Sequence, residues 1–196
     1  MSIPSTAVAA SGATDTIWIM SRASAVDPPE LAAPGVGERL RALRVARGMS
    51  ARDLARRLGI SPSAVSQIER GVMQPSVSRL IAITDELDVP LTSVFDASGP
   101  SGTATPASFG LRRAEQDAGI VLDDGVLFRR ISPVATPGVD YFESTYPPGA
   151  TAHGGADLFR HEGYEVGTVV SGELTVDFDD ERVILRAGDA ISYPCS

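Results

Sequence analysis

Arginines gather between residues 36 and 71, where they could neutralise phosphate groups. This segment holds eight arginines against three acids, Glu38, Asp53 and Glu69, so its local charge is +5, whereas the whole chain carries a formal net charge of -8. A guanidinium presents a rigid fork of donors that matches phosphate oxygens. The chain contains no lysine, so every charged contact to a phosphate would come from arginine. The segment is therefore suited to docking a polyanion.

A histidine and a carboxylate form a second group with chemical potential. His161 and Glu165 lie four residues apart in a stretch that alternates as a β-strand does, so both side chains point to one face. An imidazole and a carboxylate on the same face can share a metal ion, but structural and catalytic sites need three or more protein donors. We therefore predict no bound metal and no cofactor, and expect a hydrogen bond between His161 and Glu165 instead.

Composition divides the chain into four parts. Residues 1–35 are small, polar and proline-rich without a sustained period, which predicts a disordered N-terminal arm, although Met20 rather than Met1 could be the true start. Residues 36–96 have helical patterns, and the Pro/Gly/Ser/Thr-rich residues 97–108 indicate a linker. Residues 109–196 consist of short alternating runs between turn residues, typical of an antiparallel β domain. The predicted fold class is therefore a two-domain α + β chain.

Two further observations concern the environment of the protein. No apolar run approaches the ~20 residues that a membrane span needs, which argues against a membrane partner. The single cysteine, Cys195, excludes an internal disulfide and fits a reducing compartment. We therefore expect a cytoplasmic protein.

Cap residues mark the helices of residues 36–96. The first helix is expected to end at Gly48. Ser50 followed by Asp53 indicates the start of a second helix, which Gly59 ends. Ser61 is then the expected N-cap of a third helix, in which a proline takes the first position. The remaining two of the five predicted helices follow Pro75 and Pro90.

The pattern LAxxLGIxxxxVSxIERG at residues 54–71 resembles the Cro/C1-type (XRE) helix-turn-helix family. The resemblance covers residues 37–95 and implies a five-helix bundle like that of lambda repressor. Such a domain inserts its third helix into the major groove of double-stranded DNA. The alternative is that this helical bundle is a compact structural fold without a DNA-binding role.

The resemblance also implies roles for individual residues. Glu69 and Arg44 are implied to form a structural ion pair between the first and third helices. Gln67 is the best candidate for reading a base, because an amide can bond an adenine edge bidentately. Ala51 stands where the family usually has a phosphate-binding glutamine, so that contact falls to backbone N–H groups or to Arg52. The full DNA-binding set implied by position is Ala51, Arg52, Ser61, Ser63, Ser66, Gln67 and Arg70.

The C-terminal part resembles the cupin β-barrel. The cupin motif G-x5-H-x-H-x3-E-x6-G is matched at His161, Glu165 and Gly172, while Phe159 stands in place of the first histidine. Because the chain stops at Ser196, before the strands that would close such a barrel, we expect an incomplete, C-terminally truncated barrel or a second chain that covers the gap. The resemblance implies a domain that dimerises and senses a small molecule, with His161 and Glu165 in the effector pocket.

Taken together, these features favour a sequence-specific DNA-binding transcriptional regulator that is a homodimer and not an enzyme. Two alternatives remain open. The first is a cupin metalloenzyme, such as an iron-dependent epoxidase or dioxygenase, with the helical domain appended. The second is a binding module of the antitoxin type, which acts by capping a partner protein.

Overall fold

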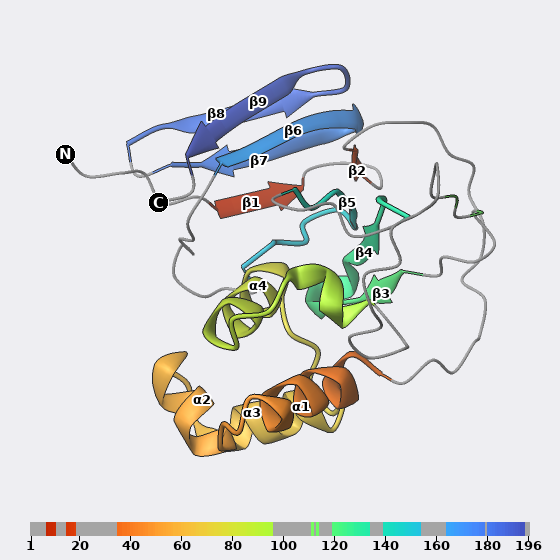
Figure 1. Ribbon diagram of the computed structural model, residues 1–196. Coiled ribbons are helices and arrows are strands. Elements are labelled where there is room, and N and C mark those ends of the chain that lie inside the picture. The colour runs from red at the N-terminus through yellow and green to blue at the C-terminus, as the bar shows by residue number, and fades with distance from the viewer. Residues whose placement is uncertain are drawn as a thin grey trace.

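The computed structural model describes residues 7–10, 15–18, 35–95, 111, 113, 119–133, 139–153, 164–178 and 180–194. Helices α1–α3 lie at one end of the molecule, most of the strands lie at the other, and α4 lies between them (Figure 1). None of the described helices combines the length and apolar character that crossing a bilayer requires. The predicted linker, residues 97–108, falls outside the described residues.

Four α-helices and one 3₁₀ helix make up the described helical domain. They are α1 (Val36–Ala46), α2 (Ala51–Arg57), α3 (Pro62–Glu69), α4 (Val77–Glu86) and the 3₁₀ helix η1 (Leu91–Val94). The prediction of five helices is thus corrected to four α-helices followed by a 3₁₀ turn. The physical reason is that η1 is only four residues long, and its amides bond three residues back: Ser93 to Pro90 at 2.9 Å, and Phe95 to Thr92 at 3.0 Å.

Serine side chains begin three of these helices. The hydroxyl of Ser50 accepts from the Asp53 amide at 3.0 Å, and that of Ser61 accepts from the Ala64 amide at 3.1 Å. Each bond satisfies an amide that has no partner within its own helix. Ser76 caps α4 in the same way. The residue after α2's C-cap is Gly59, whose φ of 64° a side-chain-bearing residue rarely adopts.

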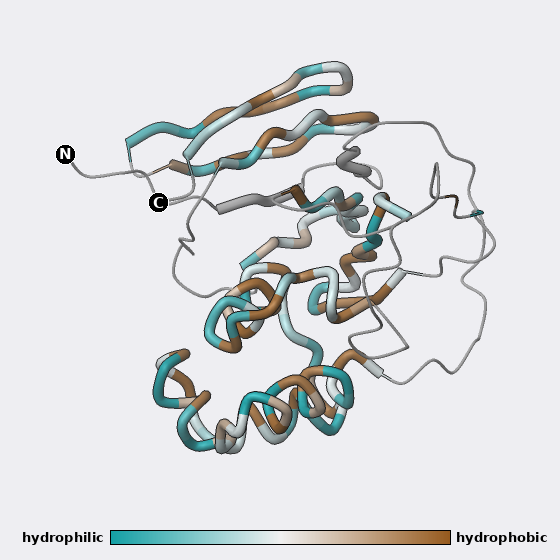
Figure 2. The backbone as a smooth tube through the Cα atoms, viewed as in Figure 1, coloured by the Kyte–Doolittle hydropathy of each residue, from teal (hydrophilic) through white to brown (hydrophobic). Residues whose placement is uncertain are grey.

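The helices bury one face each in a common core. Figure 2 shows apolar and hydrophilic residues alternating along the helices, as expected when one face is buried. The buried apolar side chains of this core include Leu40, Leu54, Ala55, Val65, Ile68, Leu80 and Ile83.

Helix α1 crosses α3 at very close range. A Cβ added at Gly37 would lie 2.1 Å from the carbonyl oxygen of Ile68 and 2.8 Å from that of Glu69. Both obstacles are backbone atoms, so a side chain cannot be accommodated by a rotamer change. The glycine therefore sets how closely α1 approaches the end of α3.

The second domain is built from antiparallel strands. Its described strands are β3 (Ile120–Val121), β4 (Leu127–Arg130), β5 (Phe142–Tyr146), β6 (Tyr164–Ser171), β7 (Glu173–Asp177), β8 (Arg182–Arg186) and β9 (Ala190–Pro194). With two strands from the N-terminal segment, they form a six-stranded sheet of order β3-β4-β5-β2-β6-β9 and a three-stranded sheet of order β1-β7-β8. Val169 of β6 packs in one apolar cluster with Leu174, Val176 and Leu185 of the smaller sheet.

Two short strands are described within residues 1–35, for which the composition predicts a disordered arm, and residues 1–6, 11–14 and 19–34 lie outside the described residues. Strand β1 (Ala7–Ala10) pairs with β7, and β2 (Asp15–Trp18) pairs on its two sides with β5 and β6. These strands fill backbone hydrogen-bonding positions that β5, β6 and β7 would otherwise leave unpaired. The composition of the segment did not reveal this, because pairing partners lie more than a hundred residues away.

The closed barrel is not confirmed. Among the described residues the strands belong to two separate sheets, and β3 and β9 end the six-stranded one. The structure therefore supports a strand-rich, two-sheet domain rather than a closed barrel.

The two domains share one hydrophobic core. Buried residues of the helical domain and residues such as Leu122 and Val126 of the β domain belong to the same cluster. Phe95, which follows η1, contacts Phe128 and Phe142, with ring centroids 5.8 and 5.5 Å apart. The rings of Phe128 and Phe142 are stacked at 4.8 Å. The helical domain is thus packed against β4 and β5.

The close contact at Gly37 leads to a prediction about stability. Gly37→Ala is expected to lower the free energy of unfolding by about 1–3 kcal/mol or more, because the added methyl forces α1 away from the α3 backbone. Urea unfolding followed by circular dichroism measures the change. Gly35→Ala is the matched control, since a Cβ there meets no atom within 4 Å. Equal losses for the two variants would contradict the steric explanation.

Candidate nucleic-acid interface

Helix α3 presents a polar face to solvent. Val65 and Ile68 are buried on its inner side, whereas Ser63 and Gln67 are exposed and Ser66 is half-buried. Residues three or four apart lie on the same face of a helix. Ser63, Ser66, Gln67 and the C-cap residue Arg70 therefore form one continuous surface.

The start of α2 lies in the same domain but is chemically different. Ser50 donates to the Asp53 carboxylate at 2.6 Å, and Arg56 lies 2.7 Å from that carboxylate. The hydrogen bond from Ser50 and then that from Arg56 hold the pKa of Asp53 below its usual range. At this helix start Ala51 is half-buried and Arg52 is exposed, so Arg52 is the side chain here that can reach a phosphate.

Several arginines of the basic segment are held by acids. Arg47 lies 3.4 Å from Asp88, and Arg57 lies 3.3 Å from Glu86. In contrast, within the part of the chain that the structure describes, Arg52 and Arg70 have no ion pair and are exposed. Arg41 on α1 is likewise exposed and has no ion pair among these residues. All three guanidinium groups are available to an anion in this domain.

A buried ion pair fixes α3 against α1. Arg44 donates through Nε to Glu69 Oε1 at 2.5 Å and through Nη2 to Glu69 Oε2 at 2.9 Å, and both side chains are about nine-tenths buried. Arg44 Nη1 also donates to the Met49 carbonyl at 2.6 Å. The hydrogen bond to Glu69 raises the pKa of Arg44 above its usual value. The two residues that the resemblance implied as a structural pair thus join α1, α3 and the end of the α1–α2 connection.

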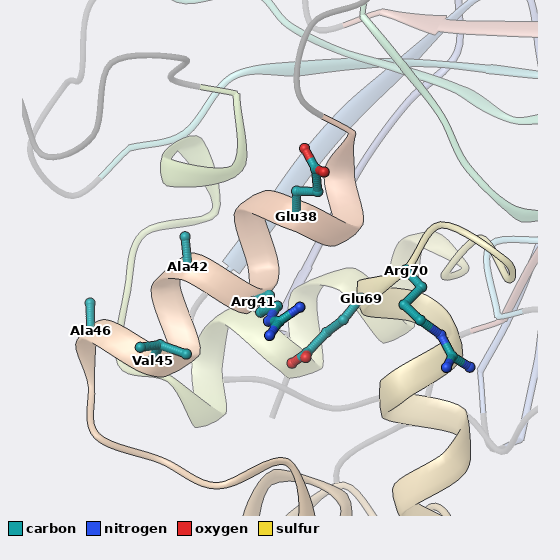
Figure 3. A pocket seen from close by; sticks show the side chains of 7 residues that line it. All are labelled: Glu38, Arg41, Ala42, Val45, Ala46, Glu69 and Arg70. Carbon is teal, nitrogen blue, oxygen red and sulfur yellow. The ribbon is translucent and has the colours of Figure 1, made fainter.

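An open depression lies on the outer side of this contact. Figure 3 shows its lining side chains, which come from α1 and from the C-terminal end of α3. They are Glu38, Arg41, Ala42, Val45, Ala46, Glu69 and Arg70. Charges of both signs and small apolar groups mix here, and no single ligand chemistry is indicated.

The candidate effector residues of the β domain are only partly described. His161 lies outside the described residues, so its expected bond to Glu165 is not tested. Glu165 on β6 is half-buried, and Tyr193 of the neighbouring β9 donates a hydrogen bond to its carboxylate. Burial raises the pKa of the Tyr146 phenol well above its usual range, and the charge of Glu165 acts in the same direction. No set of three potential metal ligands occurs among the described residues.

Sequence reasoning missed the tyrosines and a buried arginine of this domain. Tyr193 is opposite Glu165 only because of the β6–β9 register, which no local pattern specifies. Arg130 on β4 is 2% exposed, and its Nε donates to Ser132 at 3.3 Å. The neighbouring Asp140 has its pKa raised by burial, while the charge of Arg130 opposes that shift. An alternating strand with two consecutive arginines gave no signal that one of them is buried.

Comparison with known proteins finds two families in the chain. The helix-turn-helix family model matches residues 40–94, and the cupin domain model matches residues 142–196. The HTH-type transcriptional regulator PuuR of Escherichia coli (strain K12) is 28% identical over 158 residues, which cover 79% of this chain and 80% of PuuR. The HTH-type transcriptional regulator SlrR of Bacillus subtilis (strain 168) is 43% identical over 63 residues, 32% of this chain and 41% of SlrR.

Among solved structures, the crystal structure of SinR, the master regulator for biofilm formation, in complex with DNA is 32% identical. The matched region covers 31% of this chain and 98% of the SinR chain, and the TM-score is 0.30.

The chain thus carries a segment that matches the helix-turn-helix family and, on its C-terminal side, a segment that matches the cupin domain. The helices and the pattern at residues 54–71 fall within or next to the first of these segments.

The buried ion pair leads to a second prediction. Glu69→Ala leaves the Arg44 guanidinium buried without its counter-charge, so the free energy of unfolding is expected to fall by about 3–5 kcal/mol. The double variant Arg44→Met, Glu69→Leu removes both charges and should lose far less, because apolar residues of similar volume replace a buried pair at little cost. Urea unfolding of both variants measures the difference. If the double variant is as unstable as the single one, the charges themselves are not what holds α3.

Proposed function

We propose that this protein is a sequence-specific DNA-binding transcriptional regulator, not an enzyme. The observation that carries the proposal is the exposed polar face of α3, which continues to the exposed Arg70, together with the exposed Arg52 at the start of α2. The helix-turn-helix family match over residues 40–94 and relatives named as transcriptional regulators support the proposal. The proposal includes a cytoplasmic location, because a regulator must reach chromosomal DNA to bind it.

In this proposal the residues of α3 divide into readers and phosphate contacts. Gln67 lies on the exposed face of α3. Its side-chain amide can donate a hydrogen bond to N7 of adenine and accept one from the N6 amino group in the major groove. Ser63 and Ser66 supply short hydroxyl contacts next to it. Arg70 and Arg52 bind phosphates and set the register of α3 on the duplex without specifying sequence.

The remaining residues of the implied set support this surface. The hydroxyl of Ser61 already accepts from the Ala64 amide and lies 2.8 Å from the Ser63 hydroxyl. Its main contribution is therefore to hold the start of α3 and orient Ser63. Ala51 offers no polar side chain, so we assign the phosphate contact at α2 to Arg52.

The proposal includes a homodimer that responds to a small-molecule effector. Two-fold symmetry would set two α3 helices on half-sites about one helical turn apart. We assign the effector site to the inner face around Glu165, where Tyr193 donates to the carboxylate, with His161 as a further candidate. An effector would control DNA occupancy only if it bound two dimer arrangements with unequal affinity.

Substitutions in α3 separate base reading from phosphate binding. Gln67→Ala is expected to lose about 1–3 kcal/mol of discrimination at one base position. Arg70→Ala should instead weaken binding to all sequences and lower the slope of log K against log salt by about 1. Fluorescence anisotropy with cognate and scrambled duplexes at several salt concentrations measures both effects.

Arg186→Ala is the matched control for charge, because it removes the same cation from an exposed position on β8. An unchanged ratio of cognate to scrambled affinity in Gln67→Ala would show that Gln67 does not read a base.

Selection of bound sites from a random DNA pool tests the symmetry of the complex. A homodimer is expected to yield a palindromic consensus with half-sites about 10 base pairs apart, centre to centre. Equilibrium sedimentation of the bound complex then gives the number of chains per site. A non-palindromic consensus would contradict the dimer, and no enrichment at all would contradict sequence-specific binding.

A further inference from the structure

Two loops of the cupin domain bond to the segment that connects α3 to α4. The Asp123 amide donates to the Pro75 carbonyl at 3.0 Å, and the Ser78 amide donates to the Ala152 carbonyl at 2.9 Å. Asp123 begins the 3₁₀ turn η3 (Asp123–Gly125), and Ala152 lies in the loop after β5. Each backbone bond therefore joins a different cupin loop to the same short stretch of the helical domain.

The bond to Ala152 completes the N-terminal cap of α4. The first amides of an α-helix have no partner within the helix. In α4 the hydroxyl of Ser76 accepts from the Arg79 amide at 3.2 Å, and the cupin carbonyl accepts from the Ser78 amide. The start of this helix is thus satisfied partly by its own N-cap serine and partly by the other domain.

A side-chain contact ties the two cupin loops to each other. The Asp124 carboxylate accepts from the Thr151 amide and from the Thr151 hydroxyl, both at 3.2 Å. Asp124 has a φ of 56°, a conformation that Gly and Asn also tolerate. Asp123, Asp124, Thr151 and Ala152 together form what we call the α4 dock.

The dock lies close to α3 along the chain. Helix α3 ends at its C-cap Arg70, and only the exposed residues 71–74 separate it from Pro75, which is buried. Ser76 and Val77, the next residues, are 7% and 8% exposed. Four residues span at most about 14 Å even when fully extended, so Pro75 and the C-terminal end of α3 must stay close together.

We propose that the α4 dock positions α3. We further propose that the two loops of the dock carry changes in the cupin domain to the proposed DNA-binding face of α3. This inference rests on the proposed DNA-reading role of α3. With the dock closed, α3 and Arg70 are held in one arrangement before DNA arrives, which improves affinity by pre-organisation. Opening the dock removes the acceptor of the Ser78 amide and releases the α3–α4 connection.

Paired variants test the dock without changing its backbone conformation. Asp124→Gly combined with Thr151→Val removes the carboxylate and the hydroxyl. Asp124→Asn combined with Thr151→Ser is the matched control, because it keeps an acceptor oxygen, a hydroxyl and tolerance of the positive φ. Amide exchange by NMR reports the Ser78 and Asp123 amides in the full chain, with Leu54 of α2 and Val169 of β6 as internal references. Anisotropy gives the affinity for the duplex obtained by site selection.

The disrupting pair is expected to speed exchange at Ser78 and Asp123 at least tenfold and to weaken binding to the selected duplex three- to tenfold. The control pair should stay within twofold of the original protein in both measurements. Faster exchange with unchanged affinity would overturn the positioning role, and unchanged exchange would overturn the Asp124–Thr151 link. A wild-type protein that prefers no duplex would instead overturn the proposed function, a result distinguishable from both.

Discussion

The buried pair of Arg44 and Glu69 is the constraint on which the proposed DNA-binding face depends. Removing two charges from water costs more than their attraction returns unless their geometry is good and their other donors are satisfied. Both conditions are met, because the pair is bidentate and the remaining Arg44 nitrogen donates to Met49. Since Glu69 is the last residue of α3 and Gly37 brings α1 against the same turn, the helix is fixed at the end from which Arg70 and the following loop depart.

The helical domain could be predicted from the sequence almost element by element, because its determinants are local. Ser50, Ser61 and Gly59 each act on amides or dihedral angles within a few residues, so their identities alone indicate where helices begin and end. The error at η1 has the same origin: the sequence shows that a helix follows Pro90, but four residues do not reveal whether amides bond three or four positions back. The Arg44–Glu69 contact was accessible only through the family resemblance, since the two residues are twenty-five positions apart.

The β domain was predicted less completely, because strand pairing is not local. Alternation and turn residues indicate an antiparallel β domain after residue 109, and the strands β6–β9 are antiparallel strands of that region. In contrast, residues 15–18 lie between β5 and β6, although their small and polar surroundings favoured disorder. The same limit applies to the candidate site, where the partner of Glu165 is Tyr193 by register rather than by spacing. When the contact partner of a residue lies on a strand far away in the chain, the sequence around that residue does not indicate the contact.

The shared core changes how the two domains can communicate. Phe95 packs on Phe128 and Phe142, so the helical domain is not simply tethered to the cupin domain. Large apolar contacts of this kind hold the domains together, whereas the backbone hydrogen bonds of Pro75 and Ser78 to Asp123 and Ala152 number only two. One net hydrogen bond contributes about 0.5–1.5 kcal/mol, and coupling between two sites in regulated proteins typically amounts to about 1–3 kcal/mol. These two free energies are of the same size. Breaking one or two hydrogen bonds at the start of α4 would therefore cost enough free energy to alter the proposed DNA occupancy, and too little to disrupt the common core.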